Sequence, residues 1–180
     1  MSQQPLIAVL MGSDSDWSVM REAAKVLQEF QVPFEVMVTS AHRTPERTYD
    51  YAALVADRGI QLVIVGAGAA AHLGGVVAAV TPLPVIAVPL EATSLAGLDA
   101  LLSTVQMPGS VPVATMAIGK AGARNAALFA IRILALSDAS LRGRMIEFRH
   151  NMALSVEEKD RALQVTVAAE FDQAAVTLAV

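Results

Sequence analysis

Five runs of apolar residues recur along the first two thirds of the chain, and each is followed by a loop and a segment with helical spacing. Runs without regular polar alternation are typical of strands buried on both faces of a parallel sheet. The predicted strands are residues 6–11, 34–39, 60–65, 85–88 and 113 to about 118. Strands that alternate with helices predict an α/β fold, with helices on both faces of a five-stranded parallel sheet.

Helices are predicted between these strands from apolar residues spaced three or four apart. The first is marked by Trp17, Met20, Ala24 and Leu27, and the second by Tyr49, Ala52, Ala53 and Ala56 on one face, with a glycine stop at Arg58-Gly59. A short helix ends near Val80, the next carries Leu95, Leu98, Leu102 and Val105, and a long one runs from Gly119 through Leu136. The long one is apolar on most faces, so we expect it to be buried.

The remainder is predicted to be helical, in one segment near residues 141–152 and another from about 156 to the end. Ser155 and Glu158 form a capping-box pattern for the second segment. Its apolar stripe contains Leu163, Val167, Phe171 and Ala175. Residues 174–180 are too apolar for a free end. We expect one domain over residues 1–180, with a core of about 6–136 and a helical tail, 137–180, packed on neighbouring subunits.

Composition limits the classes of protein that remain. The 180 residues are 54% apolar and 17% charged, which excludes a disordered chain and favours extensive subunit contacts. The net charge of −4 without a basic run gives no sign of a nucleic-acid partner. There is no Cys, hence no disulfide or thiol nucleophile. The first five residues lack the basic start of a secretory signal, so we expect a cytoplasmic protein.

Residues 60–90 contain no charged side chain, and that length could span a bilayer. Glycines and prolines interrupt the segment, however, and it divides into two short β-branched runs. Buried parallel strands have this character. We therefore predict no membrane association.

Candidate chemistry is concentrated in residues 40–45, which join the second predicted strand to a helix. Ser40, His42 and Arg43 offer a hydroxyl, an imidazole and a guanidinium, and Thr44 and Pro45 suit the N-cap and the first helical position. Open α/β sheets bind ligands at the carboxyl ends of their strands, and a helix N-terminus there favours an anion. A surface loop that happens to hold a His and an Arg is the alternative.

The loop after the first strand offers Ser13, Ser15 and Asp16. Small residues there allow backbone N–H groups to approach an anion, and an Asp can accept hydrogen bonds from ribose hydroxyls. The alternative is ordinary capping of the next helix.

The loop after the third strand matches the dinucleotide pattern G-x-G-x-x-A from Gly66 to Ala71, with Glu91 at the end of the next strand. We reject this assignment because the pattern lies in the third βα unit and Gly74 and Gly75 interrupt the following helix. The glycines still imply close backbone approach to a ligand or a neighbouring segment.

His42 and His72 follow the second and third strands, so the topology can bring both to one edge of the sheet. No His, Asp and Glu residues have metal-ligand spacing, and there is neither a nucleophile elbow nor a phosphate-binding P-loop. The residues therefore predict anion-binding loops and a histidine that transfers a proton, without an evident metal, redox cofactor or covalent nucleophile.

Three segments together, residues 11–17, 40–45 and 66–73, resemble the N5-carboxyaminoimidazole ribonucleotide mutase family of purine biosynthesis. Residues 106–108, 117–122 and 125–128 look like later segments of that family, so the resemblance spans about 6–136. It implies a flavodoxin-like three-layer α/β/α sandwich and a homo-octamer. It also implies a nucleotide substrate, carboxylated on N5, which is converted to the 4-carboxy isomer without ATP, metal or cofactor.

The resemblance also implies residue roles. His42 would be the general acid and base, protonating the leaving nitrogen and later removing the C4 proton. The substrate-binding residues would be Ser13, Ser15, Asp16, Ser40, Arg43, Gly68 and His72. Among them, Ser15, Ser40 and Arg43 would hold the phosphate and Asp16 the ribose.

Several alternatives remain. A carboxylase that acts on the same nucleotide with free CO2 would carry Lys in place of Arg43. An NAD-dependent oxidoreductase would retain NAD on purification. A receiver-like signalling module would need an Asp at the end of the third strand, where this chain has Val65-Gly66.

The third loop also departs from the family pattern. Ala69 replaces a usual Gly, and Gly74 replaces a usual Pro. If residue 69 has a positive φ, Ala costs about 1 kcal/mol or more there. Gly74 would loosen a loop that Pro stiffens. Both affect closure of the loop, so a catalytically inactive relative also remains an alternative.

Overall fold

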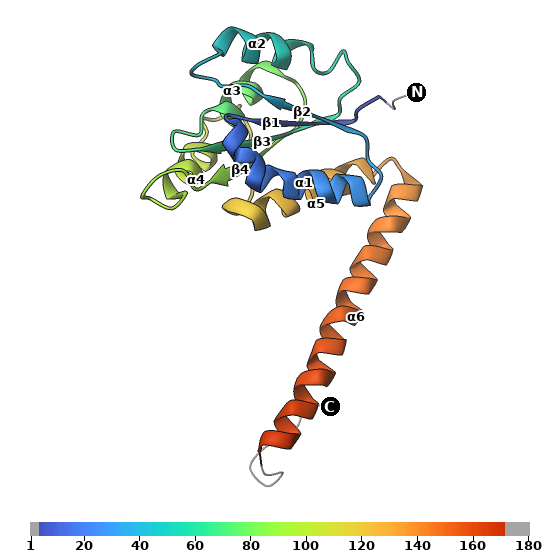
Figure 1. Ribbon diagram of the computed structural model, residues 1–180. Helices are drawn as coiled ribbons and strands as arrows, with labels where there is room; N and C mark the ends of the chain where they lie inside the picture. Colours follow the sequence, from blue (N-terminus) through green and yellow to red (C-terminus); the bar gives the residue numbers. More distant parts are fainter. Residues whose placement is uncertain (1–3, 172–180) are drawn as a thin grey trace. The chain divides into compact units, whose positions relative to one another are not determined.

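The computed structural model describes residues 4–171. Its centre is one sheet of five parallel strands in the order β2-β1-β3-β4-β5 (Figure 1). The strands are β1 (Ile7–Met11), β2 (Phe34–Val38), β3 (Leu62–Gly68), β4 (Val85–Leu90) and β5 (Ala114–Thr115). This order is the flavodoxin-like one, and the predicted five-stranded parallel sheet is confirmed.

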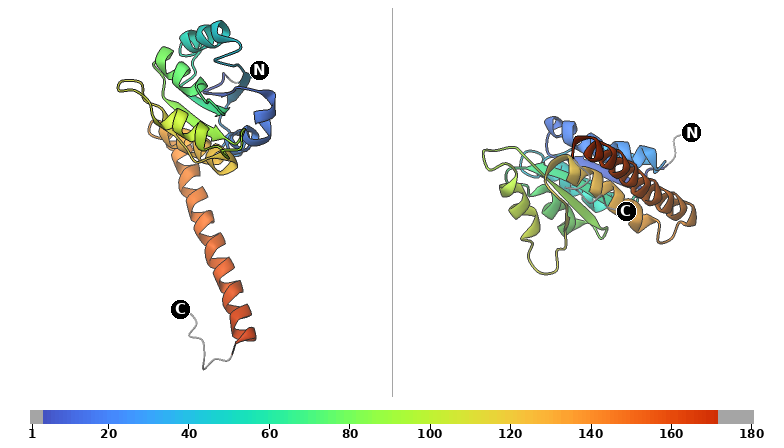
Figure 2. Two further views of the ribbon diagram at one scale, coloured as in Figure 1. Left: turned by 90° about the vertical axis from the view of Figure 1, so that its left-hand side faces the viewer. Right: turned by 90° about the horizontal axis from the view of Figure 1, so that it is seen from below.

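Helices cover both faces of the sheet, as predicted. On one face α1 (Trp17–Glu29) and α5 (Gly119–Leu134) lie side by side (Figure 2). On the other, α2 (Pro45–Leu54), α3 (Leu73–Val80) and α4 (Leu98–Val105) share a buried apolar cluster with β1 and β3. A short 3-10 helix, η1 (Asp14–Asp16), joins β1 to α1. The domain core is therefore a three-layer sandwich.

The strand order decides where the loops meet. β1 lies between β2 and β3, and Met11 at its end is in register with Val38 on one side and Gly66 on the other. Since all three strands are parallel, the loops that follow them leave the same edge of the sheet. Polar residues that are distant in the sequence are thereby brought together at this edge of the sheet.

The third strand is longer than predicted, because it continues through Gly66 to Gly68. A Cβ on Gly66 would lie 2.4 Å from the sulfur of Met20 in α1, and one on Gly68 would lie 2.5 Å from the Cβ of Ala92. The expected close approach is thus to neighbouring segments of the same chain. β4 likewise extends to Leu90, whereas β5 has only two residues.

The predicted apolar face of α2 is only partly buried. Tyr49 is 58% exposed and Ala53 is also exposed, whereas Thr48 and Ala52 are buried. The helix ends at Leu54, and Gly59 has a φ of +82° in the turn that follows. Because Thr is polar and alanines lie on both sides of the helix, hydropathy alone did not identify the buried face.

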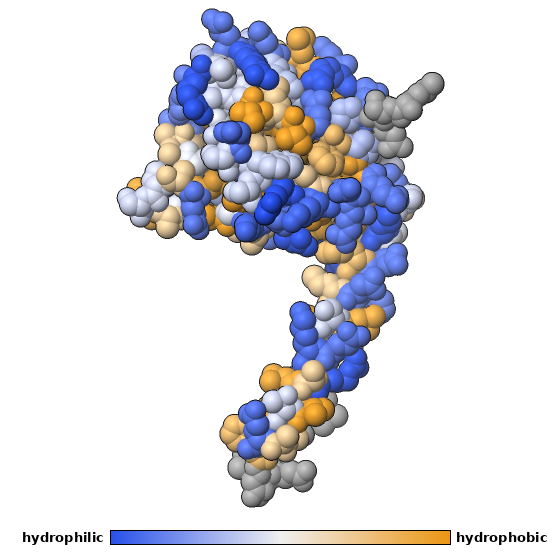
Figure 3. All heavy atoms as spheres, viewed as in Figure 1, coloured by the Kyte–Doolittle hydropathy of each residue, from blue (hydrophilic) through white to orange (hydrophobic). Residues whose placement is uncertain are grey.

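Several large apolar side chains lie on the surface. The predicted stripe of α4 is exposed, while Ala100 and Thr104 face inward. Val36 and Val38 of the edge strand β2 are each 41% exposed, and Figure 3 shows apolar side chains on the surface over this strand. Within the described residues, these apolar side chains are exposed to solvent.

The chain forms two compact units, one up to Leu134 and one from Ala135. The second contains α6 (Ala139–Glu170), whose N-cap Asp138 accepts a hydrogen bond from the backbone N of Leu141 at 2.9 Å. The predicted break before Val156 is wrong: residues 153–158 contain no Pro or Gly, and the helix is continuous. Ala175 and residues 174–180 lie outside the described residues. Assignment of both units to one domain and packing of the tail on neighbouring subunits stay predictions.

No helix within residues 4–171 is long and apolar enough to cross a membrane. The uncharged segment 60–90 instead supplies β3, α3 and β4.

Candidate active site

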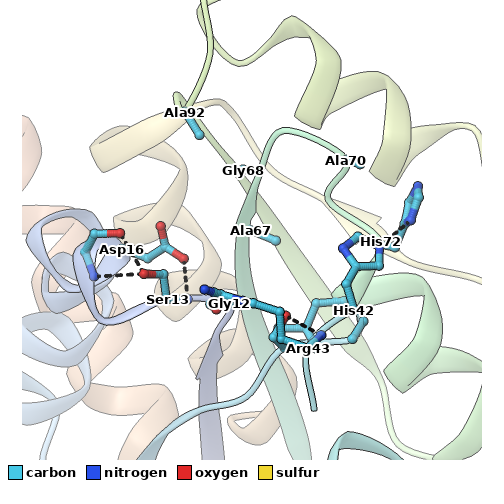
Figure 4. Close-up of a pocket in the computed structure, with 14 residues that line it drawn as sticks. Gly12, Ser13, Asp16, His42, Arg43, Ala67, Gly68, Ala70, His72 and Ala92 are labelled. Atoms are coloured by element: carbon cyan, nitrogen blue, oxygen red, sulfur yellow. Dashed lines mark hydrogen bonds between the residues drawn. The ribbon is translucent and has the colours of Figure 1, made fainter. Parts of the chain in front are cut away.

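A cavity of about 310 Å³ lies at the carboxyl ends of β1, β2 and β3. Figure 4 shows Ser13 and Asp16 on one side of it and the two histidines on the other. The cavity is lined by Gly12, Ser13, Ser15, Asp16, Ser40, Ala41, His42, Arg43, Ala67, Gly68, Ala70, His72, Leu73 and Ala92. Every residue predicted for the site is among them, so the fold brings all of them together. Their roles stay predictions.

The loop after β1 both caps a helix and lines the cavity. The Ser13 hydroxyl accepts a hydrogen bond from the Ser15 backbone N at 3.3 Å, and the Ser13 N donates to Asp16 Oδ2 at 3.0 Å. The Ser15 hydroxyl lies 2.9 Å from that of Ser13. The capping alternative is therefore correct, but it leaves these side chains in the wall of the cavity.

Asp16 is half-buried behind this cap. Burial raises the pKa of its carboxyl above the ordinary value of 3.8, while the backbone N–H groups of Ser13 and Gly12 and the charge of Arg43 oppose the rise. A carboxylate held in this way suits neutral hydroxyl donors such as those of a ribose.

Arg43 connects the loops after β1 and β2. Its Nη2 donates to the carbonyl oxygen of Gly12 at 2.8 Å, and its backbone N donates to the Ser40 hydroxyl at 3.2 Å. Pro45 is at the first position of α2, as predicted. Thr44 is the residue before it, but its side chain makes no cap hydrogen bond to the helix and bonds Ser40 instead.

The two histidines are in direct contact. His42 Nε2 lies 2.9 Å from His72 Nδ1, and the rings meet edge to face at 85° with centroids 4.9 Å apart. One nitrogen of this pair must carry the proton that the other accepts. The pair can therefore transfer or share a proton at the mouth of the cavity.

The loop after β3 is strained at Ala69, which has a φ of +52°. The expected energetic cost of Ala69 depended on a positive φ, and the structure has one at this residue. Gly74 lies in the first turn of α3, and a Cβ there would be 3.3 Å from the Cβ of Ala87. Its effect on the stiffness of this segment stays a prediction.

Sequence reasoning missed the apolar wall of the cavity, which is formed by Ala67, Ala70, Leu73 and Ala92. Ala67 lies near the end of β3, Ala70 and Leu73 follow that strand, and Ala92 follows β4; this position at the edge of the sheet was their only signal. The cavity thus has an apolar wall, a cation and hydroxyl groups from two loops, and an imidazole pair. It suits a ligand with an anionic end and a proton-exchanging ring. Within residues 4–171 no group of three His, Asp or Glu side chains could hold a metal ion.

Comparison with known proteins agrees with this architecture. The AIR carboxylase family model matches residues 6–155. An N5-carboxyaminoimidazole ribonucleotide mutase of Mycobacterium leprae is 57% identical over 164 residues, 91% of this chain and 95% of that protein. A phosphoribosylaminoimidazole carboxylase of Schizosaccharomyces pombe is 51% identical over 90% of this chain but only 29% of its own length.

Among solved structures, PurE of Treponema denticola aligns with a TM-score of 0.77 at 32% identity, covering 88% of this chain and 98% of that one. The match of the family model over most of the chain agrees with the flavodoxin-like sheet and the cavity at its edge. This chain belongs to the AIR carboxylase family.

Proposed function

We propose that the protein is an N5-carboxyaminoimidazole ribonucleotide mutase of de novo purine biosynthesis, an isomerase that moves a carboxylate from N5 to C4 of the imidazole. The observation that carries the proposal is the cavity in which His42 and Arg43 meet Ser13 and Asp16. A relative 57% identical over most of both chains bears the mutase name.

The reaction would take place in two steps. The bond between N5 and the carboxylate carbon breaks, CO2 is released into the cavity, and the nitrogen takes a proton from His42. C4 then attacks the retained CO2, and His42 removes the C4 proton, so the proton is returned and the net change is an isomerisation. An imidazole suits both transfers because it titrates near neutral pH. Retention in a small cavity keeps CO2 at high effective concentration.

The substrate would lie across the cavity. Arg43, Ser40 and Ser15 would hold the 5′-phosphate, Asp16 and Ser13 the ribose, and His72 with the backbone at Gly68 the imidazole end. This orientation is supported by the Arg43 guanidinium at Gly12 and by the imidazole pair, which lies on the other side of the cavity from Ser13 and Asp16 (Figure 4). The apolar wall would shield the CO2 from water.

A carboxylase that takes up free CO2 is the alternative, since the family model and the Schizosaccharomyces relative both carry that name. Arg43 favours the mutase, because the carboxylase class has Lys at this position.

The test supplies the purified protein with N5-carboxyaminoimidazole ribonucleotide whose carboxylate carbon is ¹³C, without ATP. Excess unlabelled bicarbonate is present in one arm and absent in the other. A mutase gives the 4-carboxy product in both arms with the label retained. Dependence on bicarbonate, or loss of the label to it, would establish the carboxylase, and no product in either arm would reject both functions.

We further propose a cytoplasmic homo-octamer. The exposed apolar side chains of β2 and α4 support self-association, because isolated subunits rarely leave so many in water. Sedimentation of the full-length protein at micromolar concentration would test the number of subunits.

A further inference from the structure

Two buried threonines lie directly beneath the loop that carries His42 and Arg43. Thr39 is 2% exposed and Thr48 is 0% exposed, and their hydroxyl oxygens are 2.8 Å apart. Thr39 directly follows β2, and Thr48 is on the inward face of α2, where an apolar residue would ordinarily pack. Buried hydroxyls at such positions need partners, and these two have them in the loop.

The hydroxyls connect the core to the backbone of the loop. Thr48 Oγ1 donates to the Thr44 carbonyl at 3.1 Å, and Thr39 Oγ1 lies 3.4 Å from Thr44 Oγ1. Thr44 Oγ1 in turn accepts from the Ser40 N at 2.9 Å and donates to the Ser40 carbonyl at 3.1 Å. Because each hydroxyl has one proton, donation by Thr48 to Thr44 requires Thr39 to donate to Thr48.

Ser40 and Thr44, which these hydrogen bonds connect, are at the two ends of the loop that carries the reactive groups. His42 and Arg43 lie between Ser40 and Thr44, and the Thr44 N donates to the Ser40 carbonyl at 2.9 Å to close the loop. Neither threonine below the loop lines the cavity. Displacement of a catalytic group by about 1 Å can cost up to a hundredfold in rate, so support of this loop bears on turnover.

We propose that Thr48, together with Thr39, is a positioning residue for His42 and Arg43: the buried hydroxyl pair holds loop 40–44 in the geometry that turnover requires. The kinetic part of this inference rests on the proposed mutase function. The structural part does not, because it concerns the order of the loop itself.

The chain offers a matched control. Thr104 is 2% exposed in α4, and its Oγ1 donates to the carbonyl four residues earlier, Ala100, at 3.0 Å, as Thr48 does to Thr44. Thr104 does not line the cavity. Thr48→Val and Thr104→Val therefore remove comparable buried hydroxyls, while Thr48→Ser keeps the hydroxyl.

The experiment measures kcat, KM and the pH profile of kcat for the mutase reaction, with amide hydrogen exchange over residues 40–44. Thr48→Val should lower kcat about tenfold, since one neutral hydrogen bond corresponds to about that factor. It should also raise KM severalfold, shift the pH profile and accelerate exchange in the loop. Thr48→Ser should stay within about twofold of wild type by the same measure, and Thr104→Val should change neither kinetics nor loop exchange.

Unchanged kinetics and loop exchange in Thr48→Val would overturn the proposal, as would equal effects of Thr104→Val. If the wild type makes no product, the mutase function fails, and exchange alone still decides whether the threonines order the loop. If Thr48→Val does not fold, Thr39→Val at the other end of the hydroxyl pair is measured in the same way.

Discussion

The loops after β2 and β3 meet at the cavity, where His42 contacts His72, yet they are held in different ways. The first, residues 40–44, is closed by hydrogen bonds between Ser40 and Thr44 and supported by buried threonines. The second passes through Ala69 at a φ of +52° before His72 N bonds the carbonyl of Ala70. The comparison indicates that His42 and Arg43 are carried by the well-bonded loop, while backbone strain is stored in the segment that leads to His72.

The largest expected effect is that of His42→Asn on the well-bonded loop. Turnover should fall by about 10²–10⁴-fold, the usual contribution of a general acid–base residue. Assembly and thermal unfolding should be unchanged, because His42 is exposed. Steady-state assays and calorimetry on the same sample check both. A rate near that of wild type would reject the acid–base assignment.

Arg43→Lys should have the next largest effect. Lysine keeps the charge but lacks the planar fork that can bond Gly12 and an oxyanion at once. KM for the nucleotide should rise about tenfold, which corresponds to about 1.4 kcal/mol, with a smaller change in kcat. Arg132→Lys, an exposed position in the last turn of α5 and outside the cavity lining, is the control. An increase in KM no larger in Arg43→Lys than in the control would reject the role of the Arg43 guanidinium.

Asp16→Asn tests the loop after β1, which is held by a helix cap and a half-buried charge. An amide still accepts from Ser13 N, but a weaker ribose contact should raise KM by up to about tenfold. The pKa of Asp16 is raised, so the folded protein retains a proton above pH 3.8 where the unfolded chain has lost it. Stability from this group therefore falls as pH rises from 3.8 through the folded pKa.

Asp16→Asn removes this titrating carboxyl and should therefore reduce the loss of stability with rising pH. Unfolding free energy measured by denaturant titration at several pH values should then fall less steeply with pH in Asp16→Asn than in wild type over this window. A steeper fall in the variant would contradict the burial of the charge.

The smallest expected effect is that of Ala69→Gly on the strained loop. Relief of the positive φ should stabilise the fold by up to about 1 kcal/mol, a rise in Tm of roughly 2–4 °C. Because Ala69 is expected to impair closure of the loop, kcat should also rise a fewfold. Ala96→Gly is the matched control, because Ala96 has a φ of +50° outside the cavity lining. It should give a similar gain in Tm without a kinetic change.

The same kinetics in both alanine variants would show that strain at Ala69 has no part in turnover, and the contrast between the two loops would then be structural only.

By itself, the sequence determined the α/β fold and assigned the polar residues of the candidate site to one edge of the sheet. Apolar runs such as residues 6–11 and 60–65 are long enough only for buried strands, and parallel strands necessarily send their loops to one edge. Ser13, His42, Arg43 and His72 could be assigned to that edge from their positions after the strands.

Only the tertiary structure decided the contacts that depend on packing between distant segments. Gly66 and Gly68 belong to a strand because they pair with Val88 and Leu90 of β4, which local sequence does not show. Met20 and Ala92 approach them too closely for a Cβ. Thr48 rather than Tyr49 faces inward because the hydroxyl of Thr39 is a hydrogen-bond partner for the buried Thr48 hydroxyl. The pairing of His42 with His72 likewise depends on the two loops meeting around β1, since hydropathy records burial tendencies but not the partner that satisfies each polar group.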